Sequence, residues 1–572
     1  MIRTPMCRRW IEACAVWTKP GKQIRHYSAS YEETMKTWHG LHTPGFNYLA
    51  NIRHMKRYMK RMGHNISDLS KLNVLHITGT KGKGSTSAFC ENILRRHGYK
   101  TGVYSSPHLI SITERFLCDG KPIETNLFKD HFWDIYNKLF RLRDSEDDMP
   151  HAFAFLTLLA FDLFLAQGVD ALILEVGIGG QYDCTNIVER PAVCGITSLH
   201  VDHVEYLGNT LESVAWHKGG VFKPGAPAVT VLQDPFVMKV LENRAEEIGT
   251  TLYEAPPLAA YDGGLEPIRL GIPGHVQQVN ASLALQMCNI WLEAQRNGFR
   301  RTAVDETSTI KSQSAKAQGF TLTDGMKNGL AQTSLPGRAH VISRPGVTYY
   351  MDTAHTDLSI QHLAEWFNRK ADEELLTLKG RVARLLIYYG SEGRDQCKHL
   401  SILQKRLRLD AVIFSAYASP TEDCSIDYIY NNVSKEEQFQ SVLSLKKFWD
   451  GSNSSTKDNM PTEGKQAGHS CASFTARSFP EALIAATGGR DLSIRGIRDY
   501  ISQQQSGKYR MTSSGDHYRD ESATWVSTKD GVCLDYPKLP EHVNDADHVQ
   551  ILLAGGFKII GHGLWYLQAD LF

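Results

Sequence analysis

One glycine-rich segment constrains this chain more than any other feature. Residues 76–86 read HITGTKGKGST, in which an apolar strand pattern runs into three glycines with Lys83 among them, and a helical pattern follows. Glycines let backbone N–H groups approach phosphate oxygens, and the N-terminus of the following helix adds a positive dipole. The segment therefore predicts a loop that binds nucleotide phosphates, with Lys83 reaching the terminal phosphates. An ordinary glycine-rich turn is the alternative.

The loop departs from the common phosphate-loop pattern GxxxxGK[ST]. Gly84 separates Lys83 from Ser85, and Ile77 stands where that pattern has its first glycine. The prediction therefore depends on the agreement of strand, loop, lysine and helix and not on the pattern alone.

Short apolar strands alternate with amphipathic helices on both sides of a predicted domain boundary near Ser334. This alternation is typical of an α/β fold with mostly parallel sheets covered on both faces. We predict an N-terminal domain over residues 31–334 and a C-terminal domain over residues 335–572. The predicted strands span residues 73–78, 100–104, 170–176, 192–198, 228–232, 348–352, 384–390, 411–416 and 549–556.

Three segments are expected to leave these cores. Residues 1–30 carry six Lys and Arg against one acid, Glu12, and read either as a transit peptide or as a disordered basic leader. Residues 300–318 show neither helical nor strand periodicity. Residues 450–470 are rich in Ser, Gly, Lys and Asn and predict a surface insertion.

Composition excludes several classes of protein. Lys plus Arg number 63 against 62 Asp plus Glu in 572 residues, so no excess of positive charge favours nucleic acid or an acidic membrane. The most apolar stretch, residues 153–174, is interrupted by Asp162, Gln167 and Asp170, and a membrane-spanning helix needs roughly 18 apolar residues. Eleven scattered cysteines without CxxC pairs indicate a reducing compartment. The expected partners are small molecules.

Several motifs together resemble the folylpolyglutamate synthases, the folate branch of the Mur ligase superfamily. The variant GTKGKGS is followed by YSSPHLISITERFLCDGKPI at 104–123, LEVGIGGQYDCTNIV at 174–188 and the segment at 197–225 that contains AWHKGG. LPGRAHVI, MDTAHT and ILLAGGFKIIGHGL then follow in the order of that family, so the resemblance covers nearly all of residues 31–572. It implies a two-domain α/β fold, with an N-terminal ATPase domain and a smaller Rossmann-like C-terminal domain.

The same resemblance implies an activity. Such a ligase would use ATP to add L-glutamate to the terminal γ-carboxylate of a reduced folate through an acyl phosphate. It would require Mg²⁺, and a monovalent cation such as K⁺ is a second candidate cofactor. A monomer that works in the mitochondrion, the cytoplasm or both is expected. Two alternatives stay open: a dihydrofolate synthase, which uses dihydropteroate as the acceptor, and a nucleotide-binding paralogue without turnover.

The resemblance also assigns residues. Glu175 ends a buried strand beside glycines, where a hard oxygen ligand suits Mg²⁺, although it could instead cap the next turn. The implied metal ligands are Ser106, Glu175 and His203. The implied ATP contacts are Gly82, Lys83, Gly84, Ser85, Arg338 and Asp352, and the implied catalytic residues are Lys83, Lys218 and His355.

Four positions carry further expectations, two of them outside that assignment. Lys218 matches a lysine that related ligases convert to a carbamate, which requires burial to lower its pKa. His355 could orient substrate or pack at a strand end. Gln181 and Thr353 depart from the family pattern, and Thr353 stands where the family has glycine, so a left-handed backbone there would be strained.

Overall fold

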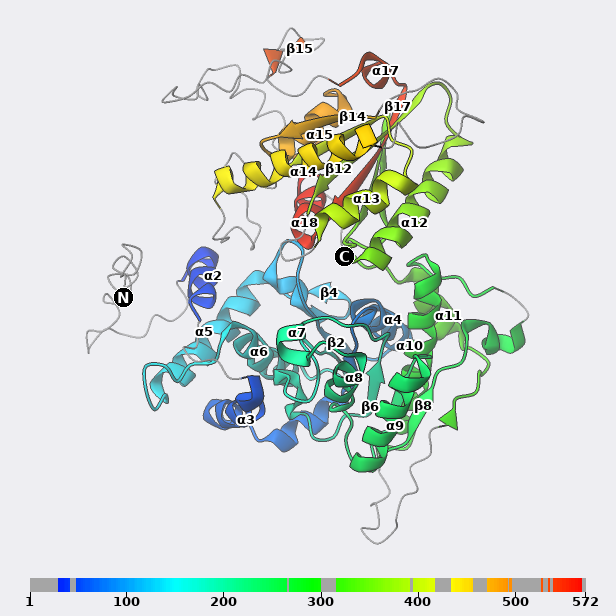
Figure 1. Cartoon of the computed structure of the whole chain (residues 1–572). Helices are drawn as coiled ribbons and strands as arrows, with labels where there is room; N and C mark the ends of the chain where they lie inside the picture. Colours follow the sequence, from blue (N-terminus) through cyan, green and yellow to red (C-terminus); the bar gives the residue numbers. More distant parts are fainter. Residues whose placement is uncertain are drawn as a thin grey trace.

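The computed structural model describes residues 29–41, 48–264, 267–299, 315–390, 395–416, 434–455, 471–491, 493–495, 526–527, 533–534 and 539–567. Two α/β units lie one above the other in Figure 1, each built on its own sheet. The polypeptide passes from the first unit to the second between α11 (Asp324–Gln332) and β10 (His340–Arg344).

The first sheet has nine strands in the order β4-β3-β2-β5-β1-β6-β7-β8-β9. The pairs from β2 to β9 are parallel, and β3 and β4 add an antiparallel edge. From β1 the chain continues to β2 on one side, whereas from β5 it crosses β1 to reach β6, so the strand order reverses beside β1. Ligands bind at such a reversal, outside the carboxyl ends of the strands. The strands are β1 (Leu75–Thr78), β2 (Thr101–Tyr104), β3 (Phe116–Cys118), β4 (Lys121–Pro122), β5 (Ala171–Glu175), β6 (Val193–Ile196), β7 (Ala228–Thr230), β8 (Leu252–Glu254) and β9 (Ala315–Lys316).

Helices cover both faces of this sheet, as β5 illustrates. Ala171 and Ile173 pack into one apolar cluster with residues of α4 and α10, while Leu172 and Leu174 pack into another with residues of α3, α5 and α6. Successive strand side chains point to opposite faces, so an uninterrupted apolar run is what a doubly covered strand requires. The helices are α2 (Tyr31–His39), α3 (Asn51–Met62), α4 (Lys83–Arg96), α5 (Thr125–Arg141), α6 (Ala152–Gln167), α8 (Leu211–Gly219), α9 (Pro235–Ile248) and α10 (His275–Arg296).

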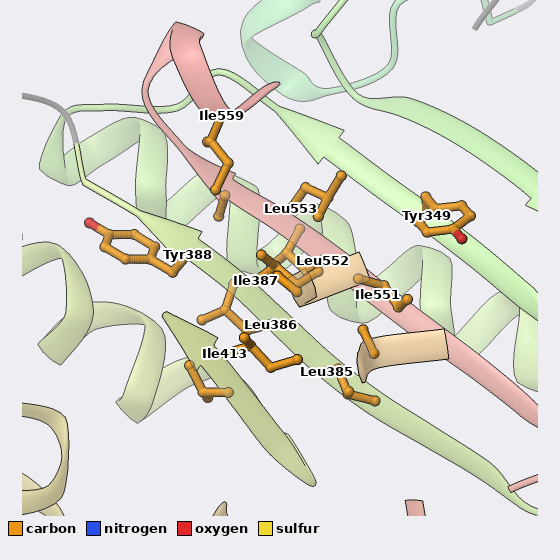
Figure 2. Packing of buried hydrophobic residues seen from close by; sticks show 14 of the residues in the cluster. Tyr349, Leu385, Leu386, Ile387, Tyr388, Ile413, Ile551, Leu552, Leu553 and Ile559 are labelled. Carbon is orange, nitrogen blue, oxygen red and sulfur yellow. The ribbon is translucent and has the colours of Figure 1, made fainter. Parts of the chain in front are cut away.

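The second sheet has six strands in the order β10-β11-β17-β12-β13-β14. Figure 2 shows aliphatic side chains of its central strands, among them Leu385, Ile413 and Leu552, packed together. β10 pairs antiparallel with β11, and the other pairs are parallel. The further elements are β11 (Val347–Asp352), β12 (Val382–Tyr389), β13 (Ala411–Ser415), β14 (Ala472–Ala476), β17 (His548–Gly555), α12 (Asp357–Leu375), α13 (Gln396–Arg406), α14 (Lys435–Ser455), α15 (Phe479–Thr487), α17 (Glu541–Asn544) and α18 (Phe557–Tyr566), with a separate two-stranded sheet of β15 (Val526–Ser527) and β16 (Cys533–Leu534).

The α/β prediction is confirmed, and each predicted strand overlaps one of these: β1, β2, β5, β6, β7, β11, β12, β13 and β17. The domain limits at residue 334 stay a prediction. No helix in the described ranges is long and apolar enough to cross a bilayer.

The segments expected to leave the cores need correction at their edges. Ala29 is buried and the Ser30 hydroxyl accepts a hydrogen bond from Glu33 N, so the last two residues of the predicted leader belong to the fold. Residues 315–318 also belong to the fold, since Ala315 and Lys316 pair with β8 and Gln318 O accepts a hydrogen bond from Gln286. Backbone hydrogen bonding does not require apolar alternation along the sequence. Residues 450–455 continue α14. The remainder, residues 1–28, 300–314 and 456–470, lies outside the described residues.

Replacing a core leucine of the second sheet should destabilise the protein far more than replacing an exposed one. Leu552 lies fully buried in β17, whereas Leu376 is 89% exposed after α12. Leu552→Ala should lower the free energy of unfolding by about 2–5 kcal/mol because it leaves a cavity. Leu376→Ala should change it by less than about 0.5 kcal/mol. Urea unfolding followed by circular dichroism measures both, and equal effects would contradict the assigned core.

Candidate active site at the interdomain cleft

The phosphate-loop segment forms a tight turn between β1 and α4. Gly79 and Gly82 both take positive φ angles, +147° and +98°. A Cβ atom on Gly82 would lie 2.2 Å from Asn280 Oδ1 of α10. Only glycine combines this backbone conformation with so close an approach. The loop geometry therefore depends on Gly82.

Lys83 and Glu175 lie together at the carboxyl end of the sheet. Ile77 of β1 is in register with Glu175 of β5, so the two strands deliver the loop and the carboxylate to one place. Lys83 Nζ donates to Gly79 O over 3.2 Å and lies 4.0 Å from Glu175 Oε1. The predicted phosphate lysine and the predicted metal ligand are thus neighbours.

Glu175 is a buried carboxylate whose pKa is affected by two opposing influences, burial and nearby positive groups. Burial raises its pKa to about 6, and the nearby Lys83 ammonium and a hydrogen bond from the Ser106 backbone oppose that rise. Ser106 and Glu175 line one cavity. Their oxygens suit a hard cation, which would favour the ionised carboxylate further.

The third predicted metal ligand is His203. It is an exposed residue with φ of +51° that precedes the short helix α7 (Val204–Leu207). It does not line the cavity that Ser106 and Glu175 share. Its role as a ligand stays a prediction.

Lys218 is buried at the end of α8. Its Nζ donates to Gly79 O over 2.9 Å, so this carbonyl accepts hydrogen bonds from both Lys218 and Lys83. Burial, and next the charge of Lys83, lower the pKa of Lys218 to about 7. A neutral amine at this position is therefore accessible near neutral pH, which carbamate formation requires.

The second domain contributes Arg338 and Asp352. Arg338 Nη1 lies 3.6 Å from Asp352 Oδ1, and Asp352 Oδ2 accepts a hydrogen bond from Ala339 N over 2.9 Å. Burial raises the pKa of Asp352, and Arg338 opposes that effect. The pair fixes the arginine at the edge of the cleft.

The departures at Thr353 and Gln181 have structural explanations. Thr353 does not take a positive φ, and its N–H donates to Gly337 O over 2.9 Å, so this backbone does not require glycine. Gln181 Oε1 accepts a hydrogen bond from Arg244 Nη2 over 2.6 Å. Neither substitution strains the backbone of the site.

Two cavities meet at the phosphate loop. One of about 280 Å³ includes Ser106 and Glu175, and one of about 780 Å³ includes Ser85, Asp352 and His355. Gly84 and Arg338 line both. A phosphoryl group at the loop could therefore face ligands in both cavities.

Sequence reasoning missed two residues at this place, Lys81 and Asn280. Lys81 Nζ contacts His355, 274 positions along the chain, and Asn280 packs against Gly82 from α10. Lys81 lay inside the motif, but no pattern within the motif indicates a partner so far away.

Comparison with known proteins decides the family. The Mur ligase middle domain profile matches residues 77–288. Over 407 residues the chain is 41% identical to the mitochondrial folylpolyglutamate synthase of Cricetulus griseus, covering 69% of this chain and 68% of that protein. The chain belongs to the folylpolyglutamate synthase family.

Solved structures of folylpolyglutamate synthases share the fold. The Mycobacterium tuberculosis enzyme, complexed with ADP and AMPPCP, gives a TM-score of 0.61 at 20% identity over 95% of this chain and 100% of that one. The bifunctional folylpolyglutamate synthase/dihydrofolate synthase of Yersinia pestis, complexed with AMPPNP and Mn, gives 0.57 at 20% identity over 96% and 100%.

Few side chains of this chain are placed to hold a metal ion. Among the described residues, no group of three or more His, Cys, Asp and Glu side chains is arranged to hold a metal. Mg²⁺ commonly binds through one or two carboxylates together with substrate phosphates and water. Glu175 and Ser106 beside the phosphate loop fit that mode.

Gly82→Ala should weaken nucleotide binding. The added Cβ would collide with Asn280 in a backbone conformation that already disfavours alanine, so we expect the dissociation constant for an ATP analogue to rise about tenfold or more. Gly63→Ala is the matched control, because Gly63 has φ of +94° with nothing within 4 Å of the added Cβ. It should cost about 1 kcal/mol of stability and leave affinity unchanged. Calorimetric titration measures affinity, and equal affinities in the two variants would contradict the assignment.

Proposed function

We propose that this protein is an ATP-dependent ligase that adds L-glutamate to the terminal γ-carboxylate of a reduced folate and forms ADP. The observation that carries the proposal is the convergence of Lys83, Glu175 and Lys218 on the phosphate loop, opposite Arg338 and Asp352 of the second domain. The choice of substrates in this proposal rests on membership of the folylpolyglutamate synthase family, at 41% identity to a mammalian member.

The reaction has two steps. The acceptor γ-carboxylate attacks the γ-phosphorus of ATP, the bond to the β–γ bridging oxygen breaks, and ADP leaves. The glutamate amine then attacks the acyl carbon, loses a proton and expels inorganic phosphate, which completes the amide. Lys83 and Arg338 offset the repulsion between carboxylate and phosphoryl group, which must come into contact.

In this proposal, the positioning of the bound substrates accounts for much of the remaining rate acceleration. Gly82, Gly84 and Ser85 lie at the N-terminus of α4, where backbone N–H groups and the helix dipole favour phosphate oxygens. Asp352 and Arg338 form an ion pair within the second domain. Closure of the second domain over the phosphate loop would bring the Arg338 guanidinium to the phosphoryl group.

A divalent metal accompanies ATP in this proposal. Glu175 and Ser106 would hold Mg²⁺, with His203 as the third ligand that the family resemblance implies. When bound, the ion neutralises charge on phosphate oxygens. A requirement for a monovalent cation such as K⁺ stays a prediction.

The family also indicates where the protein works and with what. Its mammalian relative carries the name of a mitochondrial enzyme, so we place this ligase in the mitochondrion, the cytoplasm or both. Its partners are ATP, L-glutamate and reduced folates, and a monomer is expected.

Incubation with tetrahydrofolate, ATP, Mg²⁺ and glutamate should give a series of products, each one glutamyl residue heavier, by mass spectrometry. Lys83→Met should reduce the rate by at least about 100-fold because the phosphoryl charge loses its partner. Lys60→Met, an exposed lysine of α3, is the control. Turnover with dihydropteroate alone would favour the dihydrofolate synthase alternative. ATP binding without incorporation would favour a non-catalytic paralogue.

Lys218 should carry a carbamate. Carbon dioxide reacts with neutral amines, and the neutral fraction of Lys218 rises with pH through its pKa of about 7. After addition of ¹³C-bicarbonate, a carbamate signal in ¹³C NMR should therefore be stronger at pH 8 than at pH 6. It should vanish in Lys218→Arg. A signal that persists in that variant, or none at pH 8 with nucleotide present, would exclude the modification.

A further inference from the structure

The two lysines of the phosphate loop, Lys81 and Lys83, contact different parts of the protein. Lys83 Nζ contacts Gly79 O and approaches Glu175. Lys81 Nζ instead crosses the cleft and lies 3.1 Å from Nε2 of His355 in the second domain. An ammonium can only donate hydrogen bonds, so Nε2 is the acceptor.

The loop backbone holds Lys81 in place. The N–H groups of Thr80 and Lys81 both donate to Ser198 O, over 3.0 and 3.2 Å. The Lys81 ammonium also lies 3.7 Å from Asp202 Oδ2. Backbone and carboxylate together direct the ammonium towards the second domain.

His355 is held from its other side as well. Its Nδ1 lies 2.8 Å from Thr353 O, and a carbonyl oxygen only accepts, so Nδ1 carries a proton. The backbone N–H of His355 donates to Ser359 Oγ over 3.1 Å, and its ring centroid lies 5.5 Å from that of Phe557. With Nδ1 donating, Nε2 is left as the acceptor that Lys81 requires.

We propose that Lys81 is a positioning residue: it fixes the ring orientation and tautomer of His355 and so ties the phosphate loop to the catalytic face of the second domain. The inference rests on the proposed function, in which His355 faces the substrates in the larger cavity. Lys81, Asp202 and His355 all line that cavity. If Lys81 bound phosphate groups alone, its function would not require the hydrogen bond to His355 of the second domain.

A double-mutant cycle tests the inference kinetically. Lys81→Met and His355→Gln should each lower kcat about tenfold, and the double variant should be no worse than either, because residues that act as a unit are not additive. The KM for ATP should change less than about threefold in Lys81→Met, and Lys81→Arg, which keeps a donor, should restore most of kcat. Lys60→Met again controls for loss of a surface charge.

Other outcomes overturn the inference. Losses that multiply to about 100-fold in the double variant would mean that Lys81 acts independently of His355. A raised KM for ATP with unchanged kcat would make Lys81 a phosphate ligand only. Failure of the wild-type protein to incorporate any glutamate would refute the proposed function instead.

A spectroscopic measurement decides the contact without turnover. In protein with ¹⁵N-labelled histidine rings, the His355 resonances are identified by their loss in His355→Gln. Lys81→Met should shift the Nε2 resonance of His355, because that nitrogen loses its donor, and Lys60→Met should not. An unchanged Nε2 shift in Lys81→Met would refute the contact even if the enzyme were inactive.

Discussion

The carbonyl oxygen of Gly79 is the point on which the site depends. It accepts hydrogen bonds from two lysines, Lys83 and Lys218, which come from different helices. Two ammonium groups on one acceptor repel each other, and burial makes that repulsion stronger than it would be in water. Burial, and next the charge of Lys83, lower the pKa of Lys218, whereas Lys83 has Glu175 as a partner. Lys218 is therefore a lysine of this site that can become neutral near neutral pH.

Burial also disfavours the charged form of Glu175, whose pKa it raises. A carboxylate with a pKa near 6 is held in an unfavourable environment unless cations approach it. Lys83 supplies one positive charge, and the nearby Arg338 supplies another from the second domain. A divalent cation bound at Glu175 would favour the ionised carboxylate and offset the unfavourable burial of its charge.

The second domain contributes further residues to the site around Lys83 and Glu175. Arg338 and His355 lie at the carboxyl end of β11, at the cleft edge of a sheet with its own apolar core. One hydrogen bond, from Lys81 to His355, links the second domain to the phosphate loop. Arg338 lines both cavities beside the loop, and His355 lines the larger one. Chemistry at the loop thus depends on how the two sheets are held relative to one another.

The sequence by itself determined the α/β class, the nine predicted strands and the loop around Lys83, because hydrophobic periodicity and glycine placement are local properties. It also identified Glu175 at a strand end. Only the tertiary structure decided that Lys218 is buried, that Thr353 needs no left-handed backbone, and that Lys81 reaches His355. Burial and contacts across 274 positions arise from packing between elements, and no local pattern in a single sequence encodes them.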